Sequence, residues 1–153
     1  MKWKKNDIIQ YMEAKDFIDS VLIPLVPFQV SDDNTLPSST FQSEVIQILA
    51  NEIEKELTGR VLLTPPLHYL KNTNKETEVS RLNQWVQDVK QQPFEHVFFL
   101  TFDSGWKKLE KDLDGTLLWL PGSKSGNLQS AEMRAVIKDQ VDQLGELIRS
   151  YWV

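Results

Sequence analysis

Two apolar runs interrupt an otherwise mixed pattern of hydrophobic and polar positions. The first, Val97–Phe102, has no charged residue and no alternation of apolar and polar positions. The second, Ser20–Pro27, is also continuous, although it contains Pro24. A strand that is apolar on both faces is typical of a parallel sheet with helices on both sides. Both runs therefore predict central strands, with a bulge or an early end at Pro24 because proline donates no ladder hydrogen bond.

Shorter strands and polar connections follow from the same pattern. We predict short strands at Arg60–Thr64 and Thr116–Leu120. Pro65-Pro66 breaks the first of these, so Leu67–Lys75 is predicted as a polar loop, as is Phe28–Ser39. Both loops are expected at the edge of the sheet where the strands have their carboxyl ends.

Apolar residues spaced three and four apart predict helices between the strands. Residues suited to capping lie at three helix starts: Asp7, Ser39 with Gln42 as a capping box, and Ser130. The predicted helices are Asp7–Phe17, Phe41–Leu57, Glu76–Gln91, a short one around Ser104–Lys111, and a last helix with apolar residues at Ile137, Val141, Leu144, Ile148 and Tyr151.

Helices that alternate with strands imply parallel pairing through right-handed crossovers. We therefore predict an α/β fold in a single domain over residues 1–153. Its form is a three-layer α-β-α sandwich around about four mostly parallel strands, in the order 2-1-3-4. Ligands of such folds bind at the carboxyl ends of the strands, so the sequence predicts where a site lies but not what the site does.

Composition excludes several classes of function. The net charge of −5 gives no basic surface for nucleic acid, and the absence of cysteine excludes disulfides, thiolate catalysis and cysteine-ligated zinc. The basic start lacks the apolar segment of a secretory signal, and no apolar run approaches the roughly 20 residues that a membrane span needs. We expect a cytoplasmic protein without a membrane span. Lys2, Lys4 and Lys5 are expected to form a solvated terminus, the alternative being contact with an anionic partner.

Polar residues that suit a hydrolytic or an anion-binding site fall in the four loops after the strands. No GxGxxG follows any strand, so no dinucleotide cofactor is expected. No metal site is expected either, because the only two histidines, His68 and His96, fall at opposite ends of the sheet. The candidate residues are Gln29, Asp32, Asp33 and Asn34, then His68 and Tyr69, then Asp103 and Ser104, and finally Ser123, Lys124 and Ser125.

Each candidate also has a structural explanation, which the sequence favours. Asp103 suits a general base or a metal ligand, but Asp103 or Ser104 also suits the cap of the short helix that follows. His68 suits a base or a ligand, but a histidine beside two prolines is more often a surface or packing residue. The loop Gly122–Gly126, with the sequence GSKSG, suits a backbone cradle for phosphate, but it lacks P-loop spacing and is interpreted as a flexible turn.

The opening stretch MKWKKNDIIQYMEAKDFIDSVLIPLVPF resembles the YpiF-like family, a group of small uncharacterised proteins from Gram-positive spore formers. The resemblance covers the whole length of the chain. It implies no assigned activity.

A more distant similarity concerns the fold. The run VLIPLVP, a polar loop, a helix and then RVLLTPPLHYL resemble the first half of creatininase-type amidohydrolases, which implies a creatininase-like or Rossmann-like scaffold. In that family a strand ending in Pro-x-Gly leads to metal-binding Glu and His, and the third strand ends in Asn-Gly-His-Gly-Gly-Asn. Here Phe28-Gln29-Val30 and Asp103-Ser104-Gly105 stand at those places, and only Asp32 or Asp33 and Asp103 remain as carboxylate ligands. The resemblance therefore implies the scaffold without metal-dependent amide hydrolysis.

The leading functional hypothesis is a non-catalytic domain that binds another protein and derives from a hydrolase-like scaffold. Aromatic anchors dominate protein interfaces, so Trp3, Trp106 and the Tyr151-Trp152 tail are its candidate contacts. The apolar seam of the last helix is expected to pack on the sheet, and the alternative is a homodimer contact through that helix.

The alternative hypothesis is a hydrolase or a small anionic-ligand binder that uses the carboxyl-end loops. Asp103 is then the acid/base or the single ligand, and Ser104 or Lys124 binds an anion. His68 and either Asp32 or Asp33 are expected to lie nearby. A third hypothesis, a phosphate-ligand binder at the amino ends of helices, needs only backbone N–H groups and is not excluded by the sequence.

Overall fold

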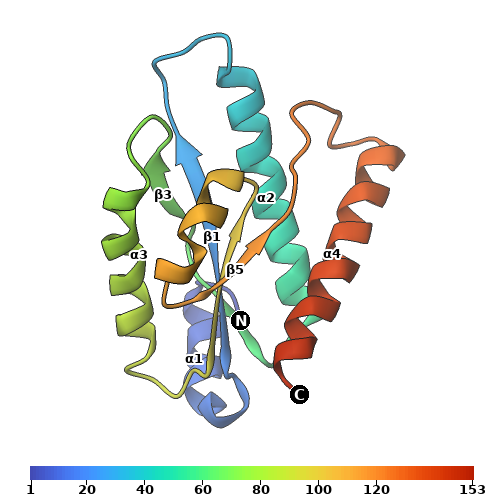
Figure 1. Ribbon diagram of the computed structural model, residues 1–153. Coiled ribbons are helices and arrows are strands. Elements are labelled where there is room, and N and C mark those ends of the chain that lie inside the picture. Colours follow the sequence, from blue (N-terminus) through green and yellow to red (C-terminus); the bar gives the residue numbers. More distant parts are fainter.

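The computed structural model describes residues 1–153 and has a five-stranded sheet as its central layer (Figure 1). The order of the sheet is β2-β1-β4-β5, with β3 paired to β1 as well, and the pairings are parallel. The predicted parallel α/β sheet is therefore confirmed. The strands are β1 (Ser20–Phe28), β2 (Val61–Leu63), β3 (Leu67–Leu70), β4 (His96–Thr101) and β5 (Thr116–Trp119).

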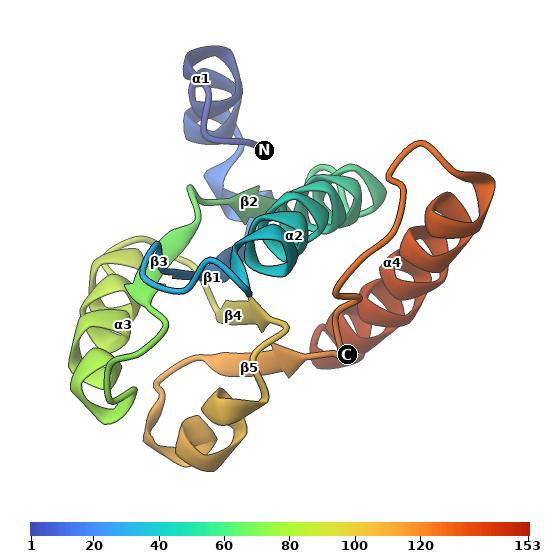
Figure 2. The same cartoon turned by 90° about the horizontal axis from the view of Figure 1, so that it is seen from above.

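Helices cover both faces of the sheet, as the two apolar runs predict. They are α1 (Lys5–Glu13), the 3-10 helix η1 (Lys15–Phe17), α2 (Leu36–Glu56), α3 (Glu76–Val89), the 3-10 helix η2 (Ser104–Asp112) and α4 (Ala131–Tyr151). α2 and α4 pack on one face, and α1, α3 and η2 contribute to the core on the other; Figure 2 shows α2 and α4 on the side of the sheet opposite to α3 and η2. None of the helices combines the length and apolar character needed to cross a lipid bilayer.

Side chains of the central strands alternate between two apolar cores. On β4, Phe98 and Leu100 lie in the core beneath α2 and α4, whereas Val97 and Phe99 lie in the core beneath α3 and η2. All four side chains are buried. Burying one such side chain contributes roughly 1.5–3 kcal/mol, so a strand buried on both faces stabilises the whole sheet.

β3 is the main departure from the predicted sheet. The sequence predicts a loop over Leu67–Lys75, but the first part of this segment, Leu67–Leu70, pairs with β1 at Leu25–Phe28. The order of the sheet therefore differs from the predicted four-strand order by this one added strand. β2 and β3 lie along the same edge of β1 and are separated by Pro65-Pro66.

β1 continues through Pro24, so neither a bulge nor an early end occurs on that strand. The Leu22 carbonyl accepts a hydrogen bond from the Thr64 N–H on the β2 side. Because backbone groups of a strand alternate in direction, the nitrogen of Pro24 points to the same edge of β1 as the Leu22 carbonyl, where Pro65-Pro66 separates β2 from β3. The missing N–H of Pro24 therefore lies opposite a gap in the ladder, which is why a central strand tolerates the proline.

α2 begins earlier than the sequence predicts. The helix starts at Leu36 with Thr35 as its N-cap and a proline in its first turn, so the predicted start at Phe41 and the capping box of Ser39 with Gln42 are wrong. The polar run with its proline favoured a loop, but proline is also well suited to the first turn of a helix. As a result Ser39 and Gln42 lie along the helix.

Two other predicted caps have different outcomes. Asp7 lies within the first turn of α1 and accepts a hydrogen bond from the Lys2 N–H, while Lys4 is the N-cap, so the predicted Asp7 cap is wrong. Ser130 caps α4 as predicted, because its hydroxyl oxygen accepts from the Met133 N–H at 3.1 Å.

Met1 lies against the outer edge of β2. Its ammonium group donates to the Val61 carbonyl and to the Glu54 carboxylate, both at 2.6 Å, and its carbonyl accepts from the Leu63 N–H at 2.7 Å. The Glu54 side chain is only 7% exposed. The edge of β2 is therefore paired within the chain, and the ion pair that holds it is largely buried.

Candidate functional site

A cleft of about 350 Å³ opens at the carboxyl edge of the sheet, where β1 and β4 end. The chain leaves β1 toward β2 on one side, whereas β4 leads to β5 on the other, so the winding changes direction between β1 and β4. Ligands of open α/β sheets bind at such a point. α2 forms one wall of the cleft, and the loops after β3 and β5 complete its rim. Figure 1 shows the start of α2 and these loops at the same end of the sheet.

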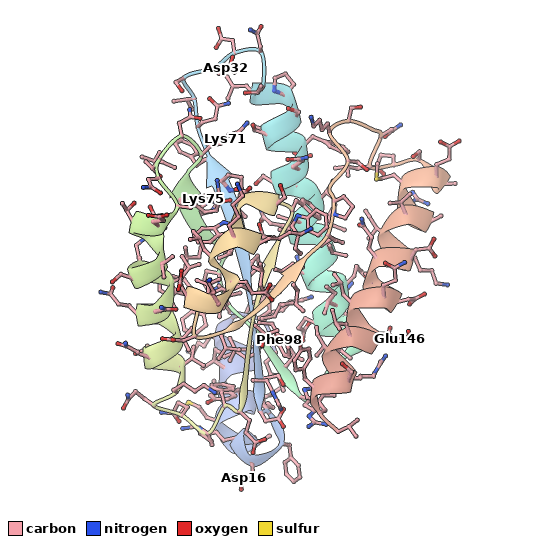
Figure 3. All side chains as sticks on the ribbon, viewed as in Figure 1. Asp16, Asp32, Lys71, Lys75, Phe98 and Glu146 are labelled. Carbon is pink, nitrogen blue, oxygen red and sulfur yellow. The ribbon has the colours of Figure 1, made fainter.

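The charges around the cleft are unbalanced. Lys71 and Lys75 come from the loop between β3 and α3, Lys124 comes from the loop between β5 and α4, and Asp103 follows β4. Three lysines and one carboxylate leave two positive charges over, in a chain whose net charge is −5. Of the three lysines only Lys75 forms an ion pair. Figure 3 shows Lys71 and Lys75 near the carboxyl ends of the strands.

Asp103 is the centre of the hydrogen-bond network on the cleft wall. The Tyr69 hydroxyl donates to its Oδ2 at 2.7 Å, and the Lys75 ammonium lies 3.1 Å from the same oxygen. The Gly105 N–H donates to Oδ1 at 2.9 Å, which is the helix cap that the sequence favours for Asp103. Asp103 therefore caps η2 and also lines the cleft.

The network fixes the charge states of its members. Burial alone would raise the pKa of Asp103, but hydrogen bonds from Tyr69, the Gly105 N–H and Lys75 outweigh burial and hold the pKa below its usual value. Burial is also the main cause that raises the pKa of Tyr69, and the Asp103 carboxylate raises it further. Near neutral pH Asp103 is thus an ionised acceptor and Tyr69 a neutral donor.

Lys75 is held in place from three sides. Its ammonium pairs with Asp103 and lies 5.9 Å from the centre of the Tyr69 ring, within reach of a cation–π contact. A Cβ on Gly105 would lie 2.9 Å from the Lys75 Cε, so only glycine leaves room for the lysine there. Tyr69 is itself fixed edge-on against the fully buried Trp106, with ring centres 5.3 Å apart. The position of Lys75 is therefore built into the fold.

The rest of the cleft lining is neutral. Ser39, Gln42 and Ser43 of α2 contribute hydroxyl and amide groups, and Ser104 adds another hydroxyl at the amino end of η2. Apolar side chains that include Val26, Ile46 and Phe102 lie deeper in the same lining. The cleft thus combines a cationic rim with hydrogen-bond donors and some apolar surface.

The sequence candidates divide into residues that line the cleft and residues that do not. Asp103, Ser104 and Lys124 line it, and Tyr69 joins it through Asp103. His68 does not, because side chains of β3 alternate: Tyr69 is buried and His68 is exposed. The predicted grouping of His68 with Asp103 therefore does not occur within the cleft.

The acidic residues of the loop after β1 have a different role. Asp32 accepts hydrogen bonds from the Asn34 N–H at Oδ1 and from the Thr35 hydroxyl at Oδ2, and its own N–H donates to Gln29. Figure 3 places Asp32 on the outer part of this loop, beyond Lys71 and Lys75. Neither Asp32 nor Asp33 lines the cleft, so the loop acids shape the loop itself.

Sequence reasoning missed the residues that give the cleft its charge. Lys71 and Lys75 lie in a segment predicted as a loop, whose candidate residues are His68 and Tyr69. The signal that identifies them is a pair of lysines four residues apart, directly after a strand that ends at the carboxyl edge of the sheet. The sequence predicts Ser39 and Gln42 as a helix cap, whereas α2 places them on the cleft wall.

The aromatic residues predicted as interaction anchors are mostly engaged within the fold. Trp106 is completely buried, and Trp152 donates from Nε1 to the Ser20 hydroxyl at 2.8 Å and lies under the Arg60 guanidinium. Tyr151 packs edge-on against Phe98 but remains 43% exposed. Trp3, at 63% exposed, is therefore the main aromatic side chain of this set on the surface.

His96 lies at the amino end of β4, as predicted, within a small charged cluster. Ligand atoms of Asp19, Glu95 and His96 all lie within 4.8 Å of one another. The Asp19 carboxylate is already paired with the Arg60 guanidinium through two contacts of 3.0 Å. Burial would raise the pKa of Asp19, but Arg60 and Ser20 lower it overall, so this cluster has the character of a structural ion pair.

Comparisons with known proteins find a family and a relative that are similar to this chain. A family model described as "Protein of unknown function (DUF2487)" matches residues 9–152. The chain is 28% identical to the uncharacterized protein YpiF of Bacillus subtilis (strain 168), over 99% of this chain and 98% of that protein. None of the solved structures matches, so the similarity to creatininase-type amidohydrolases stays a prediction.

Proposed function

The chain belongs to the DUF2487 family of proteins of unknown function, and we propose that it binds a small anionic ligand in the cleft between the ends of β1 and β4. The excess of two positive charges in this cleft is the observation that carries the proposal. Lys71 and Lys124 have no carboxylate partner, although acidic residues outnumber basic ones in the chain. Cations gathered in a concavity raise the local concentration of an anion.

The chemistry of the cleft supports binding without turnover. A general base works best with a pKa near the operating pH and a free position toward its substrate. Asp103 has a lowered pKa and already accepts hydrogen bonds or ion pairs from Tyr69, Lys75 and Gly105. His68 lies outside the cleft lining and supplies no base for Ser104. A hydrolase that uses Asp103, Ser104 and His68 is therefore the less favoured form of the proposal.

Calorimetric titration tests the proposal directly. The purified protein would be titrated at low ionic strength with inorganic phosphate, pyrophosphate and citrate. Lys71 and Lys124 are exposed, and one exposed ammonium contact is worth up to about 1 kcal/mol, so Lys71→Ala and Lys124→Ala should each weaken binding by up to about fivefold. Lys111→Ala, an exposed lysine at the end of η2, is the matched control and should bind as the wild type does. Equal binding by all three variants would contradict the proposal.

A protein-interaction role has one separate observation in its favour. Trp3 is exposed at the rim of an apolar groove of about 490 Å³, whose walls include Tyr11, Trp85 and Phe94. Such a groove suits a partner that inserts an apolar side chain. The apolar seam of α4 is buried in the chain's own core, as the sequence favours, and a homodimer through that helix would need other residues.

Site-specific photocrosslinking tests this second role. A photoreactive side chain at Trp3 should crosslink one defined protein in cells, whereas the same group at Phe17, which is 76% exposed and does not line the groove, should not. Sedimentation of the purified chain would show whether that protein is a second copy. Identical products from both positions would remove the support for a groove-specific partner.

A further inference from the structure

Asp103 has one hydrogen-bonding position that the fold leaves free. A carboxylate offers about four lone-pair positions, two on each oxygen. Tyr69 and Lys75 occupy those on Oδ2, and the Gly105 N–H occupies one on Oδ1. The side chain is 23% exposed and lines the cleft. A ligand in the cleft therefore meets an ionised oxygen that can only accept a hydrogen bond.

This carboxylate treats two oxyanions of similar shape differently. Inorganic phosphate carries at least one proton near neutral pH, whereas sulfate carries none. The P–OH group can donate to Asp103, which forms a short, charge-assisted hydrogen bond. A sulfate oxygen at the same place would face a like charge without a proton between them. The lysines cannot make this distinction, because ammonium groups donate to either ion.

We propose that Asp103 makes the cleft selective for a protonated oxyanion, so that its ligand is inorganic phosphate or a phosphate monoester and not sulfate. The inference rests on the proposed anion-binding function and adds the class of the ligand. Asp103 is then a specificity-determining residue that also positions Lys75. The lysines supply affinity, and the carboxylate supplies the choice between ligands.

Competing titrations with phosphate and sulfate at pH 6.5 and equal ionic strength test the inference. The wild type should prefer phosphate at least about tenfold, the ratio that one good hydrogen bond to a charged group provides. Asp103→Asn replaces one acceptor oxygen by an amide that donates, so it should bind sulfate better and bring the ratio to within about twofold. The exposed Asp112 gives a matched control, and Asp112→Asn should keep the wild-type preference.

A pH series on the wild type distinguishes the two sources of phosphate and does not depend on any variant's folding. A phosphate monoester loses its second proton with a pKa of about 6, whereas inorganic phosphate keeps a proton to higher pH. Binding of glycerol phosphate should therefore weaken between pH 5.5 and 7.5 more than binding of inorganic phosphate does. A monoester that binds more tightly as pH rises would overturn the inference.

The outcomes separate the two levels of the proposal. If phosphate, sulfate, pyrophosphate and citrate all fail to bind, the anion-binding function itself fails. If only pyrophosphate or citrate binds, anion binding stands and the inference about phosphate is overturned. If phosphate and sulfate bind with similar affinity, anion binding stands and the role of Asp103 in selection is overturned. If sulfate binds more tightly than phosphate, the cleft selects against a protonated ligand and the inference is again overturned.

Discussion

Gly105→Ala is expected to weaken anion binding while leaving the fold almost unchanged. An ideal Cβ at this position would lie 2.9 Å from the Lys75 Cε, 3.1 Å from its Nζ and 3.1 Å from Asp103 Oδ1. The closest atom belongs to the far end of a flexible side chain, so the lysine moves, the Asp103 carboxylate shifts by a few tenths of an ångström at most, and the backbone stays in place. The expected product is a folded protein whose Lys75 no longer reaches Asp103.

Two small effects nearly cancel in the free energy of unfolding. Loss of the partly exposed pair between Lys75 and Asp103 costs about 0.2–1 kcal/mol. Gly105 does not have a positive φ, so alanine is compatible with its backbone and stabilises by about 0.4–1 kcal/mol through the unfolded state. The net change should lie within about 0.5 kcal/mol, whereas anion affinity loses one ammonium contact, or about fivefold.

A double-mutant cycle on Gly105→Ala and Lys75→Ala provides the assay. Phosphate affinity is measured by calorimetry, and stability by urea unfolding. If the alanine at position 105 acts through the lysine, it has no further effect once Lys75 is absent, so the double variant binds as Lys75→Ala does. Additive losses in the double variant would refute this reasoning.

Three further predictions concern stability, each measured by urea unfolding. Asp103→Asn should cost about 1.5–3 kcal/mol at pH 7, because the hydrogen bonds that it weakens are to a charged group. Because the pKa of Asp103 is lowered in the folded state, this stabilisation is present above the unfolded-state pKa of about 3.9 and is lost as pH falls through the folded-state pKa. The free energy of unfolding of the variant should therefore decline less steeply below pH 4 than that of the wild type. The same decline in both proteins would argue against this role of Asp103. Trp106→Ala should cost about 3–5 kcal/mol because Trp106 is fully buried, and a loss below 1 kcal/mol would contradict the packing described. Glu54→Gln should cost about 1–3 kcal/mol by removing the charge that pairs with the Met1 ammonium, with the exposed Glu44→Gln as a control that should have no measurable effect.

The central strands could be predicted because their signal is local. Val97–Phe102 is apolar at every position but Thr101, and only a strand covered on both faces uses such a run. β3 could not be predicted in the same way. Its four residues alternate, follow Pro65-Pro66, and pair with β1 through a register that depends on the gap opposite Pro24. That register is a property of the assembled sheet.

The position of the candidate site could be predicted from the sequence, but the set of residues that line it could not. The rule that ligands bind at the carboxyl ends of parallel strands points to Asp103, Ser104 and Lys124, and all three line the cleft. It also points to polar residues of the same loops that do not line it: Gln29, Asp32, Asp33, Asn34, Ser123 and Ser125. The same rule groups His68 with Asp103, because the sequence predicts a loop over Leu67–Lys75. Once β3 is a strand, its period of two turns Tyr69 inward and His68 outward. The missed lysines, Lys71 and Lys75, depend on where β3 ends.

The position of Met1 affects whether a second molecule can associate with the edge of the sheet at β2. The outermost strand of a sheet normally offers free N–H and carbonyl groups on which a second chain can add a strand, the first step toward fibrils. At β2 these groups include the Val61 carbonyl and the Leu63 N–H, and both are satisfied by Met1. An incoming strand would have to displace a residue that is also tied down by Glu54. A single amino acid thus occupies the place on this margin that an added strand would need.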